Sequence, residues 1–141
     1  MSIFSMLLAI LAGIFTTIES SINSQLGKYL TPSIATLHSL IVGMTFMLLI
    51  NLLLGNVPRY AKVSDVNPVW LIGGFFGAFI IYLSSKAIPK LGISNTLILI
   101  LAGQMVSGLL IDAFINNAQI SFKKMTGMIL FLIGAVIFLK D

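Results

Sequence analysis

The chain contains five apolar runs, each long enough to cross a lipid bilayer. Hydrophobic residues make up 58% of its 141 residues and charged residues only 9%, whereas about 25% of residues are charged in ordinary soluble domains. A soluble domain of this size cannot bury so much apolar surface, so the composition predicts an all-α integral membrane protein. A membrane-spanning helix needs about 17–25 such residues. The predicted spans are 3–26, 33–54, 68–87, 94–115 and 125–139.

The breaks between the runs carry residues typical of turns: Gly27-Lys28 and Pro32, then Gly55 to Pro68, Pro89 to Gly92, and Asn116 to Lys124. Pro32 and Pro68 stand where a helix can begin, because the first helical turn does not need the N–H that proline lacks. Ser94 is predicted to cap the fourth span. Most connections are short, which favours one compact up-and-down transmembrane domain over residues 1–141. The first run lacks the basic segment and cleavage motif of a secretory signal, so we expect it to be a span.

Glu19 lies inside the first span, where a charge is unfavourable by about 2.5–3.5 kcal/mol on insertion scales and by default marks a pathway or a binding site. Thr16, Glu19 and Asn23 follow spacings of three and four, so they share one helix face. We predict that these three, together with Gln104 in the fourth span, bind substrate or protons. Hydrogen bonding between helices explains Thr16, Asn23 and Gln104 equally well. His38 is expected to be an interfacial histidine held by hydrogen bonds rather than a proton relay.

Small residues at regular spacing predict close contacts between helices in lipid. Ala35, Ser39 and Gly43 follow one another at intervals of four in the second span. Gly127 and Gly134 lie seven residues apart on one face of the fifth span. This glycine pair is the predicted contact between subunits.

The basic residues are balanced between the two sides of the membrane. With five spans, the side of the N-terminus carries Arg59, Lys62, Lys123 and Lys124, and the opposite side carries Lys28, Lys86, Lys90 and Lys140. Cytoplasmic loops normally hold an excess of Lys and Arg, which fixes orientation. The balance predicts either a weakly biased protein with one orientation or a dual-topology protein whose copies pair antiparallel, and we favour the second. Lysines in loops are typical of contact with lipid headgroups, not with nucleic acid.

The sequence offers little for catalysis or for a cofactor. It contains no cysteine and a single histidine, so a thiolate site or a protein metal cage is not expected. No nucleophile–base pair, HExxH motif, Walker loop or dinucleotide fingerprint is present. We therefore predict that the protein is not an enzyme and needs no cofactor.

Three tracts of the sequence, "NSQLGKYL", "AIPKLG" and "LAGQMVSGLLIDAF", together resemble the YdcZ-like proteins, which are short five-helix members of the drug/metabolite transporter superfamily. The resemblance extends over essentially the whole chain. It implies a half-sized transporter of the bacterial cytoplasmic membrane that forms a ten-helix bundle from two copies in opposite orientation. Inverted repeats of this kind place their sites near the midplane, at the repeat interface.

The related small multidrug resistance proteins carry a glutamate in their first helix and a glycine pair in their last. Glu19 and the pair Gly127/Gly134 resemble these features in kind. Glu19 lies about 7 Å beyond the centre of its span, so two antiparallel copies would place their carboxylates about 15 Å apart along the helix axis. The resemblance also implies that glutamine is common at this position, which leaves a neutral or zwitterionic substrate open beside a cationic one.

The function predicted from these features is secondary active transport of a small metabolite or a cationic compound by alternating access. A carboxyl group in a partly wet cavity can hold a proton or a cation but not both at once, so Glu19 would couple protons to substrate. The working unit would be a dual-topology antiparallel homodimer. The alternative is a non-transporting membrane subunit or a small pore-former that packs with a larger or a sister membrane partner.

Overall fold

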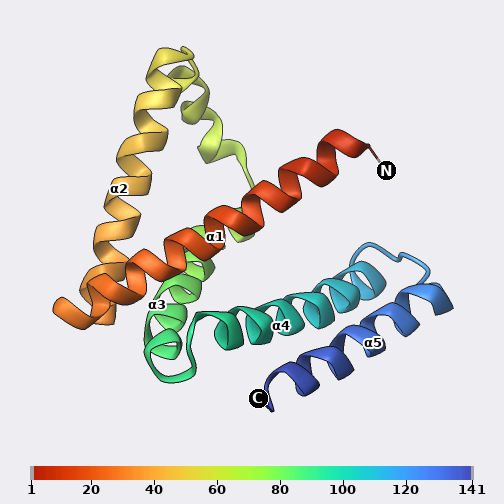
Figure 1. Cartoon of the computed structure of the whole chain (residues 1–141). Helices are drawn as coiled ribbons and strands as arrows, with labels where there is room; N and C mark the ends of the chain where they lie inside the picture. Colours follow the sequence, from red (N-terminus) through yellow and green to blue (C-terminus); the bar gives the residue numbers. More distant parts are fainter. Residues whose placement is uncertain (1, 141) are drawn as a thin grey trace. The chain divides into compact units, whose positions relative to one another are not determined.

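The computed structural model describes residues 2–140, and every regular element in that range is helical (Figure 1). In chain order the elements are α1 (Ile3–Tyr29), α2 (Pro32–Leu53), the 3-10 helices η1 (Val57–Asp65) and η2 (Pro68–Ile72), α3 (Gly73–Leu91), α4 (Ile93–Phe114) and α5 (Phe122–Phe138). The predicted all-α class is confirmed for this part of the chain. The chain divides after Lys90 into two compact units, each described by itself below.

Four helical stretches are long and apolar enough to cross a membrane. They are Ile3–Tyr29, Pro32–Leu53, Pro68–Leu91 and Ile93–Phe114. Helix α5 has 17 residues, which corresponds to about 25 Å at 1.5 Å per residue, against about 30 Å of hydrocarbon in a typical bilayer. The fifth span therefore stays a prediction, as does the single transmembrane domain.

The junction between α3 and α4 differs from its prediction. Helix α3 continues through Pro89, so a break beginning at that proline is wrong. Gly92 alone joins the two helices, with a φ of +82° that glycine adopts without a Cβ clash. Helix α4 begins at Ile93, so Gly92 and not Ser94 occupies the N-cap position.

The longest predicted connection, from Gly55 to Pro68, is largely ordered. Most of it forms η1, and Pro68 begins η2, where the Asn67 side chain accepts a hydrogen bond from the backbone N–H of Val69 (3.0 Å). A 3-10 helix has three residues per turn, so residues three apart lie on one side of it. This places the apolar residues Val57, Tyr60 and Val63 on one side of η1, and the cations Arg59 and Lys62 on another.

The burial pattern of the first unit is that of a protein surrounded by lipid. Apart from Ile88 of α3, its buried side chains are small or polar, such as Ala35 at 0% exposure and Asn23 at 4%. Large apolar side chains point outward, with Ile10 60% exposed and Phe15 66% exposed. In lipid no hydrophobic effect drives helices together, so they approach through small residues and hydrogen bonds.

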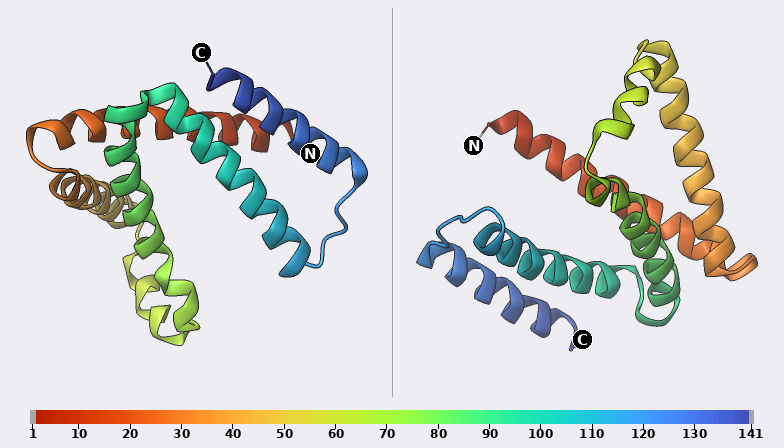
Figure 2. Two further views of the ribbon diagram at one scale, coloured as in Figure 1. Left: turned by 90° about the horizontal axis from the view of Figure 1, so that it is seen from below. Right: turned by 180° about the vertical axis from the view of Figure 1, so that it is seen from behind.

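Helices α1 and α2 form a hairpin that is narrow at its turn and opens away from it (Figures 1 and 2). A Cβ added to Gly27 would lie 3.5 Å from Pro32 Cα and 3.9 Å from Ala35 Cβ. Farther along α2, a Cβ on Gly43 would meet nothing within 4 Å. The close approach predicted from small residues therefore occurs at Ala35, and it is lost at Gly43 because the helices have diverged.

The second unit consists of α4 and α5, which pack side by side and run in opposite directions (Figure 2). Ser121 caps α5, since its side chain accepts a hydrogen bond from the backbone N–H of Lys124 (3.3 Å). Ala135 is the buried residue of α5. Gly127 and Gly134 are exposed, and a Cβ on either would meet nothing within 4 Å. Within residues 91–140, this glycine face is thus free of contact.

Candidate functional site

The polar stripe of α1 meets a hydroxyl group of α2. Asn23 Nδ2 donates a hydrogen bond to Ser39 Oγ (3.2 Å), and Ser39 Oγ donates one to Glu19 Oε1 (3.4 Å). Ser39 has a single hydroxyl proton, which it donates to the carboxylate. Its oxygen accepts the hydrogen bond from the Asn23 amide. The three side chains therefore form a continuous hydrogen-bonded chain that links the two helices and ends at Glu19.

These side chains lie along an open groove of about 990 Å³ between α1 and α2. Its polar residues are Thr16, Glu19, Asn23, His38 and Ser39, and its apolar residues are Ala12, Phe15, Ile18, Ile22, Leu26, Val42 and Phe46. Ligand sites are typically about 300–1,000 Å³ and mostly apolar, with a few polar groups that orient the ligand. The groove has this composition and is large enough for a small metabolite.

The residues of the groove differ in what they can offer a ligand. Asn23 is buried and hydrogen-bonded to Ser39, so it fixes the position of the Ser39 hydroxyl. Glu19 is exposed, so its carboxylate remains open to a ligand or a proton. The Thr16 hydroxyl donates to the carbonyl oxygen of Ala12 (2.9 Å) within α1, which leaves it only acceptor capacity. Thr16, Glu19 and Asn23 therefore share one face of α1, as the spacing predicted, but only Glu19 has a charged group free for a ligand.

For two residues of the groove, the sequence predicted a role other than the one that the structure indicates. Ser39 was expected only as a small residue for helix contact, and its hydroxyl is the direct partner of Glu19. His38 was expected to be an interfacial histidine held by hydrogen bonds, and it is an exposed residue of the same groove as the carboxylate. The signal for Ser39 was present, because serine is both small and a hydrogen-bond donor.

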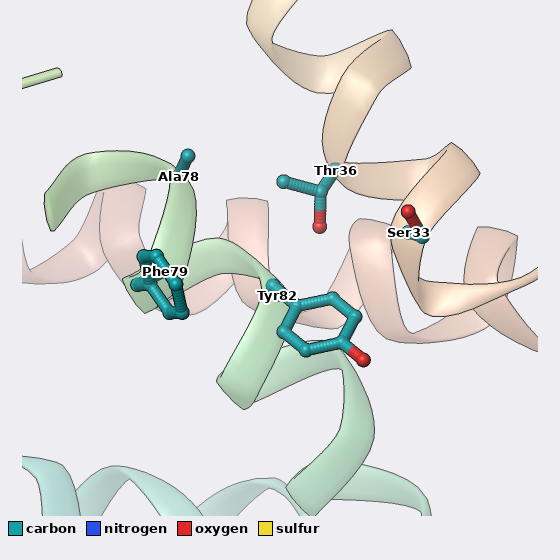
Figure 3. A pocket seen from close by; sticks show the side chains of 5 residues that line it. All are labelled: Ser33, Thr36, Ala78, Phe79 and Tyr82. Carbon is teal, nitrogen blue, oxygen red and sulfur yellow. The ribbon is translucent and has the colours of Figure 1, made fainter. Parts of the chain in front are cut away.

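A second cavity, of about 280 Å³, lies between α2 and α3 in the first unit. Figure 3 shows its residues: Ser33, Thr36, Ala78, Phe79 and Tyr82. The Thr36 hydroxyl donates to the carbonyl oxygen of Pro32 (2.8 Å), and Lys86 Nζ donates to the Tyr82 hydroxyl (3.4 Å). This cavity is smaller than most ligand sites, and the hydroxyls of Thr36 and Tyr82 already have partners. The groove beside Glu19 is therefore the stronger candidate.

The remaining predicted site residues belong to the second unit. Gln104 is exposed on α4, and Gly127 and Gly134 are exposed on α5. Their roles in substrate binding and in dimer contact stay predictions. Among residues 2–140, no three His, Cys, Asp or Glu side chains gather into a group that could hold a metal ion.

The sequence matches, over residues 4–137, the family described as "Putative inner membrane exporter, YdcZ". The chain belongs to the YdcZ family. Membership confirms the resemblance noted in the sequence and, with the four span-length apolar helices, identifies an integral protein of the inner membrane with a role in transport. No curated protein and no solved structure matches the chain.

A transport family needs a site that can take up and release a solute within the membrane. In this YdcZ-family chain, the groove between α1 and α2 provides a carboxylate on a mostly apolar wall, within two span-length helices. Membership of an exporter family also favours a transporter over an enzyme.

Proposed function

We propose that the chain is a secondary active transporter that carries a small metabolite or a cationic compound across the inner membrane by alternating access. The observation that carries this proposal is the Asn23–Ser39–Glu19 chain of hydrogen bonds along the open groove of about 990 Å³. Placing an ionisable group at membrane depth costs free energy, so such a group usually marks a functional site. Here it faces a space that can hold a solute.

Exchange of a proton for substrate follows from the chemistry of Glu19. The ionised carboxylate attracts a cation, and protonation removes that attraction, so the two ligands compete for one group. The Ser39 hydroxyl donates to the carboxylate and stabilises its charge while the site is empty. The family description favours export, in which protons would move inward as substrate moves outward.

The proposed working unit is an antiparallel homodimer of ten helices. Three observations support it. The basic residues are balanced four against four when five spans are counted, the groove between α1 and α2 is open, and the glycine face of α5 has no contact within residues 91–140 of its own unit. A second copy would complete the enclosure of the groove. Gln104 would contribute a neutral amide to the same site.

Transport is tested with purified protein in liposomes that contain a trapped pH-sensitive dye. Choline and betaine share a trimethylammonium group but differ in net charge, and glycerol serves as a neutral solute. An antiporter coupled through Glu19 is expected to release protons to the side from which choline enters, with saturation, and to respond less to betaine and glycerol. Proton movement no greater than in protein-free liposomes for all three solutes would contradict coupling. Choline flux without proton movement or saturation would indicate the pore-former instead.

Orientation is tested by placing single cysteines at Ser2 and Lys140 of this cysteine-free chain. A membrane-impermeant maleimide is applied to intact cells and to inverted vesicles. We expect each terminus to react from both sides, because copies insert in both orientations. Reaction of each terminus from one side only would contradict the antiparallel homodimer. If both termini then react from the same side, α5 does not cross the membrane.

A further inference from the structure

A second open groove, of about 840 Å³, lies between the C-terminal part of α2 and η1, away from Glu19. Helix η1 folds back along the end of α2 (Figure 1, yellow to yellow-green). The groove is lined by Met44, Met47, Leu48 and Asn51 of α2, and by Asn56, Val57, Arg59, Tyr60 and Ala61. It has no part in the transport mechanism proposed above.

The two walls of this groove differ in chemistry. The α2 wall is apolar, because Met44, Met47 and Leu48 follow the spacing of one helix face. Methionine side chains are flexible and adapt to an irregular apolar partner. The η1 wall carries the cation Arg59 and the aromatic residue Tyr60. An occupant must therefore combine an apolar chain with a negatively charged group.

The charge at this groove comes mainly from Arg59. Lys62 lies one 3-10 turn farther along the same side of η1 and adds a second cation. Asp65 follows on that side after another turn and offsets part of the charge of Lys62. Arginine can bind a phosphate group through two parallel N–H groups, whereas the ammonium group of lysine acts as a point charge. Arg59 is therefore well suited to hold a phosphate in a defined orientation.

We propose that this groove binds one anionic phospholipid, with its phosphate group on Arg59 and an acyl chain along Met44, Met47 and Leu48. A free phosphate ion would leave the apolar wall without a partner. A neutral protein helix would leave Arg59 without a counter-charge. An anionic phospholipid supplies an acyl chain for the apolar wall and a negative charge for Arg59. The groove also lies at the connection between two predicted spans, which is the depth of lipid headgroups.

The proposal is tested by native mass spectrometry of the purified full chain with phosphatidylglycerol or phosphatidylcholine of identical acyl chains. We expect phosphatidylglycerol adducts to exceed phosphatidylcholine adducts about fivefold, since one basic residue near an anionic membrane surface contributes about that factor. Arg59→Gln should remove this preference. Met47→Gln should reduce adducts of both lipids, because it places an amide on the apolar wall.

Lys123→Gln is the matched control, since it removes a cation from the first turn of α5, away from this groove, and it should leave the preference unchanged. Equal adducts of the two lipids on the unaltered chain would overturn the proposal. An unchanged preference in a helical, folded Arg59→Gln variant would do so as well. Displacement of phosphatidylglycerol by inorganic phosphate would assign the groove to a soluble anion instead.

Discussion

Glu19→Gln is expected to abolish the pH dependence of substrate binding and to weaken choline binding about 10- to 100-fold. Glutamine keeps the shape of the side chain and still accepts a hydrogen bond from Ser39, so the substitution removes the charge but retains the link between α1 and α2. The trimethylammonium group of choline has no N–H, so its attraction to the carboxylate is that of two opposite charges. At a separation of about 4 Å this amounts to about 1 kcal/mol in water and about 4 kcal/mol at an effective dielectric constant of about 20, and every 1.4 kcal/mol is about tenfold in affinity. In the unaltered protein, choline binding should fall as the pH falls, because protons compete for the carboxylate.

The measurement is equilibrium choline binding at acidic, neutral and alkaline pH. Asp112→Asn is the matched control, since Asp112 is also a carboxylate of a span-length helix and instead accepts a hydrogen bond from Asn116 (3.0 Å). This variant should bind like the unaltered protein. If Glu19→Gln keeps the original pH profile, Glu19 is not the coupling group.

Gly134→Leu is expected to weaken dimerisation at least about tenfold, a loss of about 1.4 kcal/mol. Close helix approach in lipid depends on small residues, and a leucine would hold the second copy away. Within the single chain, a Cβ at this position meets nothing within 4 Å. The substitution should therefore leave the fold of α4 and α5 intact and act only between copies.

Dimerisation is measured by energy transfer between differently labelled copies in liposomes as the protein is diluted into lipid. Gly13→Leu is the control, because Gly13 is an equally open glycine on another helix. A Gly134→Leu variant that remains fully dimeric would exclude this face of α5 as the contact. Function would then require a different interface.

The helices could be predicted from the sequence because length and apolar composition alone determine what can cross a bilayer. The polar face of Thr16, Glu19 and Asn23 could be predicted too, since spacing within one helix fixes which residues share a side. The bond between Ser39 and Glu19 could not be predicted in this way. It depends on where α1 and α2 lie side by side, and periodicity within one helix contains no such information.

Helix ends were less predictable than helix centres. A break was expected to begin at Pro89, but α3 continues through it to Leu91. The proline removes one backbone hydrogen bond, to the carbonyl four residues before it, and the helix ends two residues later. Gly92 alone then links α3 to α4 and occupies the N-cap position that was predicted for Ser94. The 3-10 helix η1 was missed because its residues have no long apolar run, only a three-residue period.

The hairpin of α1 and α2 is held by weak forces. Two hydrogen bonds connect the polar stripe of α1 to Ser39, and bonds between helices in lipid average about 0.6 kcal/mol each. Together they contribute about 1 kcal/mol, which is close to twice the thermal energy. We therefore expect the hairpin to open easily on the side away from its turn, and a ligand that prefers one width of the groove by only about tenfold would determine which width predominates.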